Sequence, residues 1–234
     1  MLSLISFFTN IPSKGTLENA SKETYLLPII ALIISLPSAI VFYFLFFLPS
    51  IIRAVIGILF IYAINGIIHL DGLADFSDGI MIKGPKDKKI KALKDVNTGI
   101  AGLFSVLFVI LLEIFSLYSI RISLLNVLSF FIISEFSAKF SMSLGLINRP
   151  QGEGLGAIFQ KNFKKWFLVI AILITLPFFL LFHYYYFFSF VGFLISLIIS
   201  KICKKNFGMV NGDCLGAMNE ISRSITMVVL CSVL

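Results

Sequence analysis

Three aspartates lie within eight positions of a chain that has only 12 acidic residues. Asp71, Asp75 and Asp78 are spaced i, i+4 and i+7, so on a helix their carboxylates fall within about 60° of one another. Like charges on one face destabilise a helix, and a divalent cation would remove that repulsion. Carboxylate oxygens of this kind suit Mg²⁺. The spacing therefore predicts a Mg²⁺ site formed by Asp71, Asp75 and Asp78.

Small residues accompany these aspartates. Gly72 and Ala74 allow a bulky group or another helix to approach the backbone, and Gly79 allows the helix to end just past the last aspartate. A solvated helix end with charged side chains is the simpler interpretation, but it does not require three aspartates on one face. His69 lies about 160° from that face, which favours a hydrogen-bonded interface histidine over a metal ligand.

The composition places these residues in a membrane protein. Hydrophobic residues make up 59% of the 234 positions, charged residues only 13%, and 26 residues are Phe. A water-soluble domain has about 25% charged residues. The formal net charge of +7 comes largely from short segments between apolar runs, which is typical of topology signals and not of nucleic-acid binding. We therefore expect the protein to be embedded in a lipid bilayer and not to bind nucleic acid.

Apolar runs of spanning length predict an all-α, polytopic helical bundle of about seven transmembrane helices, since only helices or closed barrels can cross a bilayer. We expect one membrane-embedded domain over residues 1–234, and the sequence leaves its oligomeric state open. The predicted spans are about 25–46, 51–70, 99–120, 122–146, 166–183, 185–202 and 220–234.

The distribution of basic residues predicts the orientation. Residues 83–94 contain six lysines, and residues 149–165 and 201–205 are also basic, whereas the alternate turns carry almost no charge. The positive-inside rule then places the N-terminus in the cytoplasm, in a multi-pass protein of the cell membrane. The cytoplasmic segments would be 1–24, 80–98, 147–165 and 203–219. The aspartates, at the end of the second span, would face the cytoplasm.

Five blocks of the sequence, in order, are similar to motifs of the cobalamin synthase family, also called adenosylcobinamide-GDP ribazoletransferase. The block from His69 to Gly79 (HLDGLADFSDG) is the most specific of them. The other four are Phe8 to Pro12 (FTNIP), Lys94-Asp95 with Gly99, Gly152 to Gly156 (GEGLG) and Asn211 to Ala217 (NGDCLGA). The sequence departs from the family pattern where Asn211 replaces an expected Thr and Lys139 replaces an expected Arg.

The resemblance implies a Mg²⁺-dependent transfer. A ribose hydroxyl of α-ribazole, or of its 5′-phosphate, would attack the phosphorus next to the cobinamide in adenosylcobinamide-GDP, and GMP would leave. Asp75 and Asp78 would be catalytic, with Asp78 the candidate base because it is nearest the loop. Asp95 would be a further metal ligand beside Asp71, Asp75 and Asp78. The substrate-binding residues would be Lys94, Glu153, Asn211 and Asp213.

Local structure offers a second explanation for several of these residues. Asp95 fits an ordinary helix N-terminus, Asn211 to Asp213 fits a turn followed by an N-cap, and Glu153 fits a flexible glycine loop. Inside the predicted spans, Glu135 and Lys139 are spaced for an ion pair, while Glu113 has no evident partner.

Two other functions are consistent with part of the pattern. A CDP-alcohol phosphotransferase also uses several aspartates separated by Gly and Ala, but with its first two aspartates three positions apart and not four. An ion-coupled transporter would place its carboxylates near the bilayer midplane, whereas these lie at the membrane edge. Release of GMP would distinguish the transferase from a transporter.

Overall fold

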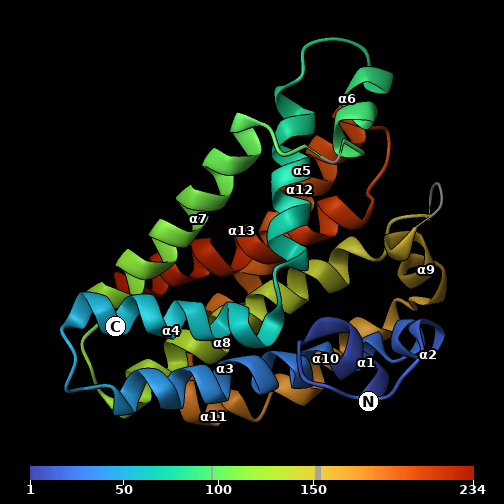
Figure 1. The fold of residues 1–234 in the computed structure, drawn as a ribbon. Helices are drawn as coiled ribbons and strands as arrows, with labels where there is room; N and C mark the ends of the chain where they lie inside the picture. The colour runs from blue at the N-terminus through green and yellow to red at the C-terminus, as the bar shows by residue number, and fades with distance from the viewer. Residues whose placement is uncertain (96, 151–153) are drawn as a thin grey trace.

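The computed structural model describes residues 1–95, 97–150 and 154–234 (Figure 1). In this part of the chain every regular element is helical, which confirms the prediction of an all-α membrane bundle. The elements are α1 (Leu2–Phe8), α2 (Leu17–Lys22), η1 (Thr24–Leu26), α3 (Leu27–Phe44), α4 (Ser50–Asn65), α5 (Ile68–Met81), α6 (Lys86–Leu93), α7 (Ile100–Ser119), α8 (Leu124–Gly145), α9 (Leu155–Asn162), α10 (Trp166–Thr175), α11 (Phe178–Phe182), η2 (His183–Phe190), α12 (Val191–Asn206) and α13 (Gly212–Cys231).

Helix α8 forms the centre of the bundle. It packs against α3, α12 and α13, and nearly all of its residues from Val127 onward are buried. Its phenylalanines interlock with those of its neighbours, as in the stacked pair Phe140 and Phe190. Large apolar side chains on α3, α7 and α12 remain exposed, for example Phe104 and Leu194. In a bilayer these outward side chains face lipid, so the outer surface and the core can both be apolar.

The chain ends lie at opposite ends of the bundle (Figure 1). At the C-terminal end, Asn126 donates a hydrogen bond to the Leu234 carbonyl (3.1 Å) and Tyr185 to that of Val233 (3.3 Å). At the other end, Asn162 bonds Ser21 (2.8 Å) and Lys89 bonds Asn206 (2.6 Å). These bonds join segments that the predicted topology places on the same side of the membrane.

The helices differ in length from the predicted spans. Among the described residues, four helical stretches are long and apolar enough to cross a membrane: Thr24–Phe44, Ile100–Ser119, Leu124–Gly145 and Phe178–Asn206. The bent pair of α4 and α5 counts as a fifth if it is taken as one span. The predicted boundary between the fifth and sixth spans coincides with a backbone break at His183, which has a positive φ of 50°, although helical structure resumes at once and continues to Asn206. The fifth predicted span is itself interrupted after α10, at Pro177. The last run begins at Gly212 and not at residue 220.

The second predicted span is interrupted before the aspartates. Helix α4 ends at Asn65, and α5 leaves it at an angle of 96°. Gly66 adopts a positive φ of 74°, which favours glycine. Asn10 satisfies the end of α4, since its backbone N–H bonds the Ile64 carbonyl (2.7 Å) and its side chain bonds that of Ala63 (3.1 Å). The N-terminal segment thus stabilises the bend that turns the aspartate helix away from the direction of α4.

Candidate active site

The site forms where α5 crosses α13. Gly72 and Gly216 face each other at the crossing, and a Cβ added to Gly72 would lie 3.1 Å from the Asp213 Cα. A Cβ on Gly216 would lie 3.0 Å from the His69 carbonyl oxygen. The small residues noted in the sequence therefore allow two backbones to approach closely, which brings Asp71 on α5 and Asp213 on α13 to one pocket.

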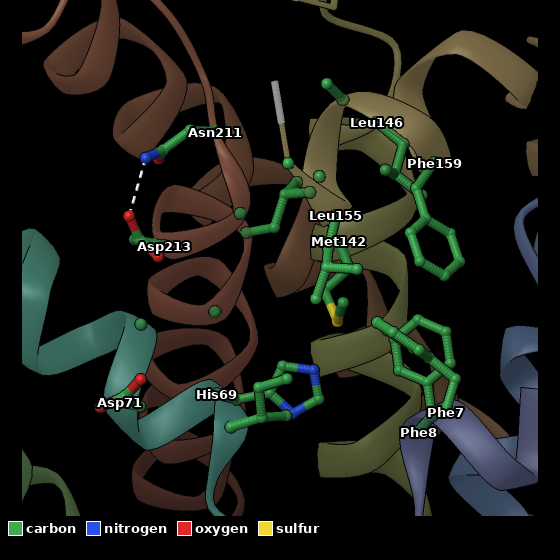
Figure 2. Close-up of a pocket in the computed structure, with 18 of the residues that line it drawn as sticks. Phe7, Phe8, His69, Asp71, Met142, Leu146, Leu155, Phe159, Asn211 and Asp213 are labelled. Carbon is green, nitrogen blue, oxygen red and sulfur yellow. Dashed lines mark hydrogen bonds between the residues drawn. The ribbon is translucent and has the colours of Figure 1, made fainter. Parts of the chain in front are cut away.

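This pocket is a cavity of about 390 Å³ at the end of the bundle opposite the C-terminus. Figure 2 shows two contrasting sides. Asp71, Asn211 and Asp213 form the polar side, and Phe7, Phe8 and Phe159 form the aromatic side. Helices α1, α5, α8, α9 and α13 all contribute lining residues. Segments from almost the whole length of the chain are needed to build it.

Asn211 and Asp213 begin helix α13. The Asn211 side chain accepts a hydrogen bond from the Cys214 N–H (3.1 Å) and donates one to an Asp213 carboxylate oxygen (2.7 Å). The N-cap expected for this turn is therefore present. Burial raises the pKa of Asp213 and the nearby charge of Asp71 raises it further, while the hydrogen bond from Asn211 acts in the opposite direction.

Asp78 has a different environment from the one predicted. Its two carboxylate oxygens accept hydrogen bonds from the backbone N–H groups of Gly99 (2.6 Å) and Gly102 (2.9 Å) at the start of α7. A Cβ at Gly102 would come within 2.6 Å of one of these oxygens. Asp78 thus satisfies the exposed donors of a helix N-terminus, and it does not line the pocket. This geometry argues against its expected function as the catalytic base.

Asp71 and Asp75 remain free of such contacts among the described residues. Asp71 is exposed and lines the pocket, whereas Asp75 is half-buried one turn further along α5 and, like Asp78, is not a lining residue. The charged neighbours of Asp75 are Asp213, Asp71 and Asp78. In the described part of the chain no cation forms an ion pair with Asp71, Asp75 or Asp213.

The carboxylates can be compared with what Mg²⁺ requires. Within the described ranges, no three His, Cys, Asp or Glu side chains converge closely enough to hold a metal by themselves. Mg²⁺ in phosphate-transfer sites is usually held by one or two carboxylates together with water and substrate phosphates. Asp71, Asp75 and Asp213 are neighbouring oxygen donors without a cation partner, so their chemistry fits such a site.

The other predicted substrate and metal residues fall into three groups. Lys94 lines the pocket, as expected for a phosphate contact. Asp95 is exposed, does not line the pocket, and accepts hydrogen bonds from the backbone and side chain of Asn97, which lower its pKa. Glu153 lies outside the described residues. The structure therefore brings Lys94, Asn211 and Asp213 together with Asp71, but not Asp95.

His69 lies at the base of the pocket, between its polar and aromatic sides (Figure 2). It is buried, and its Nδ1 lies 3.2 Å from the Asn65 amide nitrogen. The prediction of a hydrogen-bonded histidine agrees with this contact. That the ring also lines the cavity could not be predicted from the sequence, because it depends on the packing of α1 and α9 beside α5.

A buried ion network lies among α4, α7, α8 and α13. Arg223 bonds Glu113 (2.9 Å), Glu135 (3.2 Å), Glu220 and the Tyr62 hydroxyl (2.8 Å). Lys139 lies 3.7 Å from Glu135, so the predicted ion pair is present, and it also donates to Asn219 (2.9 Å). All five charged side chains have no solvent exposure. Arg223 is thus the partner that Glu113 lacked in the sequence.

The fold and the pocket define a helical membrane protein with a partly acidic cavity at one end. Residues 1–231 match the family model for cobalamin-5-phosphate synthase. The chain is 39% identical to the adenosylcobinamide-GDP ribazoletransferase of Pyrococcus abyssi, over 98% of this chain and 97% of the relative. It is 38% identical to the adenosylcobinamide-GDP ribazoletransferase of Pyrococcus furiosus, over 98% of this chain and 98% of the relative. It is 33% identical to that of Clostridium tetani, over 100% of this chain and 96% of the relative. No solved structure matches this chain.

The chain belongs to the cobalamin-5-phosphate synthase family. The resemblance noted from its motifs is therefore confirmed.

Proposed function

We propose that this protein joins adenosylcobinamide-GDP to α-ribazole, or to its 5′-phosphate, with release of GMP. The names of its full-length relatives support this substrate pair. The observation that supports it most directly is the pocket, whose lining combines Asp71, Asp213 and Lys94 with the first turns of α9 and α13. Helix N-termini and a lysine favour phosphate groups, and unpaired carboxylates favour a divalent cation.

In the proposed reaction, the oxygen of a ribose hydroxyl forms a new bond to the phosphorus next to the cobinamide. The bond from that phosphorus to the GMP oxygen breaks, and the hydroxyl loses its proton. We assign the proton acceptor to Asp75 in place of Asp78. Neither side chain lines the pocket, but the Asp75 carboxylate is one turn from Asp71 and accepts no hydrogen bond among the described residues, whereas both oxygens of Asp78 already accept backbone N–H bonds. Lys94 and the first turns of α9 and α13 would hold the phosphates in line for the transfer.

Mg²⁺ is the proposed cofactor, with Asp71 and Asp213 as the residues that would hold it, so that Asp75 stays available as the proton acceptor. When bound, it would neutralise negative charge on the phosphate oxygens. Asn211 would keep the Asp213 carboxylate in position through the 2.7 Å hydrogen bond. Asp78 would act indirectly, by fixing the start of α7 beside α5.

The test is to incubate the purified protein in nanodiscs with both substrates and Mg²⁺ and to measure GMP by chromatography. We expect stoichiometric GMP and cobamide product, loss of both with chelator, and recovery on adding Mg²⁺. Failure of the wild-type protein to release GMP would contradict the proposal. Transport of a corrinoid into proteoliposomes without GMP release would favour a transporter.

We also propose that the pocket faces the cytoplasm, in a protein of the cell membrane. The lysine-rich segment 83–94 lies at the pocket end of the bundle, where Lys89 contacts Asn206, and basic segments are retained inside. Cysteines introduced at Lys88 and Asn206 should react with an impermeant reagent only after the membrane is opened. Labelling of either cysteine in intact cells would contradict this orientation.

A further inference from the structure

We propose that the aromatic side of the pocket binds the benzimidazole base of the ribazole substrate, and that His69 donates a hydrogen bond to the free ring nitrogen of that base. This inference rests on the function proposed above, and it adds which substrate occupies this side and which residue selects its base.

The aromatic side is a continuous set of rings. Phe7 and Phe159 have ring centroids 4.8 Å apart, Phe8 and Phe159 5.5 Å, and Phe8 stacks on the His69 imidazole at 6.1 Å with an interplanar angle of 15°. Met142, Leu146 and Leu155 complete this part of the lining. These rings contact one another, and a flat aromatic ligand can pack against the surface that they form. Among the side chains that form this side of the pocket, His69 carries the N–H donor.

The hydrogen bond of His69 leaves one ring nitrogen for a ligand. As Asn65 is oriented, its amide nitrogen faces the ring and can only donate, so Nδ1 accepts this bond (3.2 Å). A neutral imidazole with an accepting Nδ1 carries its hydrogen on Nε2. Nε2 has no hydrogen-bond partner among the described residues. Nε2 of His69 is therefore an oriented side-chain donor next to the aromatic side of the pocket.

The two substrates carry three large ring systems that are candidates for this side of the pocket: benzimidazole, guanine and the corrin macrocycle. The glycosylated benzimidazole is a flat apolar bicycle with one ring nitrogen that accepts a hydrogen bond and no donor. Guanine presents several donors and acceptors on its edge, which the aromatic side would leave unpaired at a cost in binding. The corrin macrocycle with its amide side chains is too large for a cavity of about 390 Å³. The benzimidazole is the group that matches.

The position of the base is also consistent with the proposed chemistry. The polar side with Asp71 and Asp213 adjoins His69 (Figure 2). A base seated on the aromatic side would direct its attached ribose toward those carboxylates. The attacking hydroxyl would then lie on the side of the pocket where the phosphates and the proposed Mg²⁺ are held.

The test compares α-ribazole with its indole analogue, in which a C–H group replaces the free ring nitrogen. For the wild-type protein we expect the analogue to have about a tenfold higher KM in GMP release. In His69→Phe this ratio should fall to about one, while the KM for adenosylcobinamide-GDP stays unchanged. Phe44→Leu, on the outer surface of α3, should behave as the wild type does.

Two further measurements keep the outcome clear if His69→Phe does not fold. Phe159→Leu should raise the KM of both ribosides by the same factor, about fivefold. Equilibrium dialysis of α-ribazole and of its indole analogue against the purified wild-type protein should show that the protein binds α-ribazole more tightly, in the absence of turnover.

Equal affinity of the wild-type protein for the two ribosides would overturn the inference. So would a Phe159→Leu effect on adenosylcobinamide-GDP alone. If the wild-type protein releases no GMP but still prefers ribazole in dialysis, the proposed function fails and the binding assignment stands.

Discussion

Carboxylates gather at two places in this bundle, and their surroundings are opposite. Glu113, Glu135 and Glu220 have no solvent exposure and meet Arg223 and Lys139 inside the bundle. At the pocket, Asp71 is exposed and Asp213 is half-buried, and neither has an ion-pair partner among the described residues. A charge inside a bilayer is costly unless the protein neutralises it. Paired carboxylates therefore stabilise the fold, while unpaired ones at an open pocket remain available for a ligand.

The largest expected effect comes from removing the central cation of the network. Arg223→Met would leave Glu113 and Glu220 buried without their main partner, and we expect the free energy of unfolding to fall by about 3–5 kcal/mol. The measurement is denaturant or thermal unfolding in detergent. Arg121→Met, an exposed position in the turn before α8, is the control and should change stability by about 0.5 kcal/mol or less. Similar stability of the two variants would contradict the structural role of the network.

The second prediction concerns the unpaired carboxylates at the pocket. Asp71→Asn keeps the size of the side chain but removes its charge, so we expect GMP release to fall about a hundredfold with unfolding unchanged. Asp87→Asn, on the exposed helix α6, should retain wild-type turnover. A loss of stability in Asp71→Asn comparable to that of Arg223→Met would remove the distinction between the two clusters.

Asp78 belongs to neither cluster and should show the smallest effect. Asp78→Ala would leave the Gly99 and Gly102 N–H groups without their acceptor, which should cost about 1–2 kcal/mol of stability. Because Asp78 does not line the pocket, the remaining folded protein should keep more activity than Asp71→Asn. If GMP release from Asp78→Ala falls as far as that from Asp71→Asn at full stability, Asp78 is the base after all.

Local patterns in the sequence predicted the parts of the molecule that depend on neighbouring residues. The i, i+4 spacing predicted the pair of Glu135 and Lys139, and the turn at Asn211 predicted the cap of α13. Hydropathy predicted a helical membrane bundle. These features form from interactions within one helix or one turn.

Interactions between distant segments were not predictable in this way. Glu113 and Arg223 are 110 positions apart, and no periodicity connects them. The bend before α5 has a local signal in Asn65-Gly66, where Gly66 adopts a positive φ, but the Asn10 bonds that stabilise it come from far away in the chain. Asp78 fits the helical face of Asp71 and Asp75, but the start of α7 comes close enough to bind it. Tertiary packing therefore decided which aspartates remain available.

Binding of Mn²⁺, followed by electron paramagnetic resonance, tests most directly whether the unpaired carboxylates form a metal site. The purified protein would be titrated with Mn²⁺ in the presence of adenosylcobinamide-GDP, in place of the Mg²⁺ that gives no signal. We predict a saturable site that is present in the wild type and in Asp87→Asn and is lost in the Asp71→Asn, Asp213→Asn double variant. Saturable binding of the same affinity in the double variant would contradict the account.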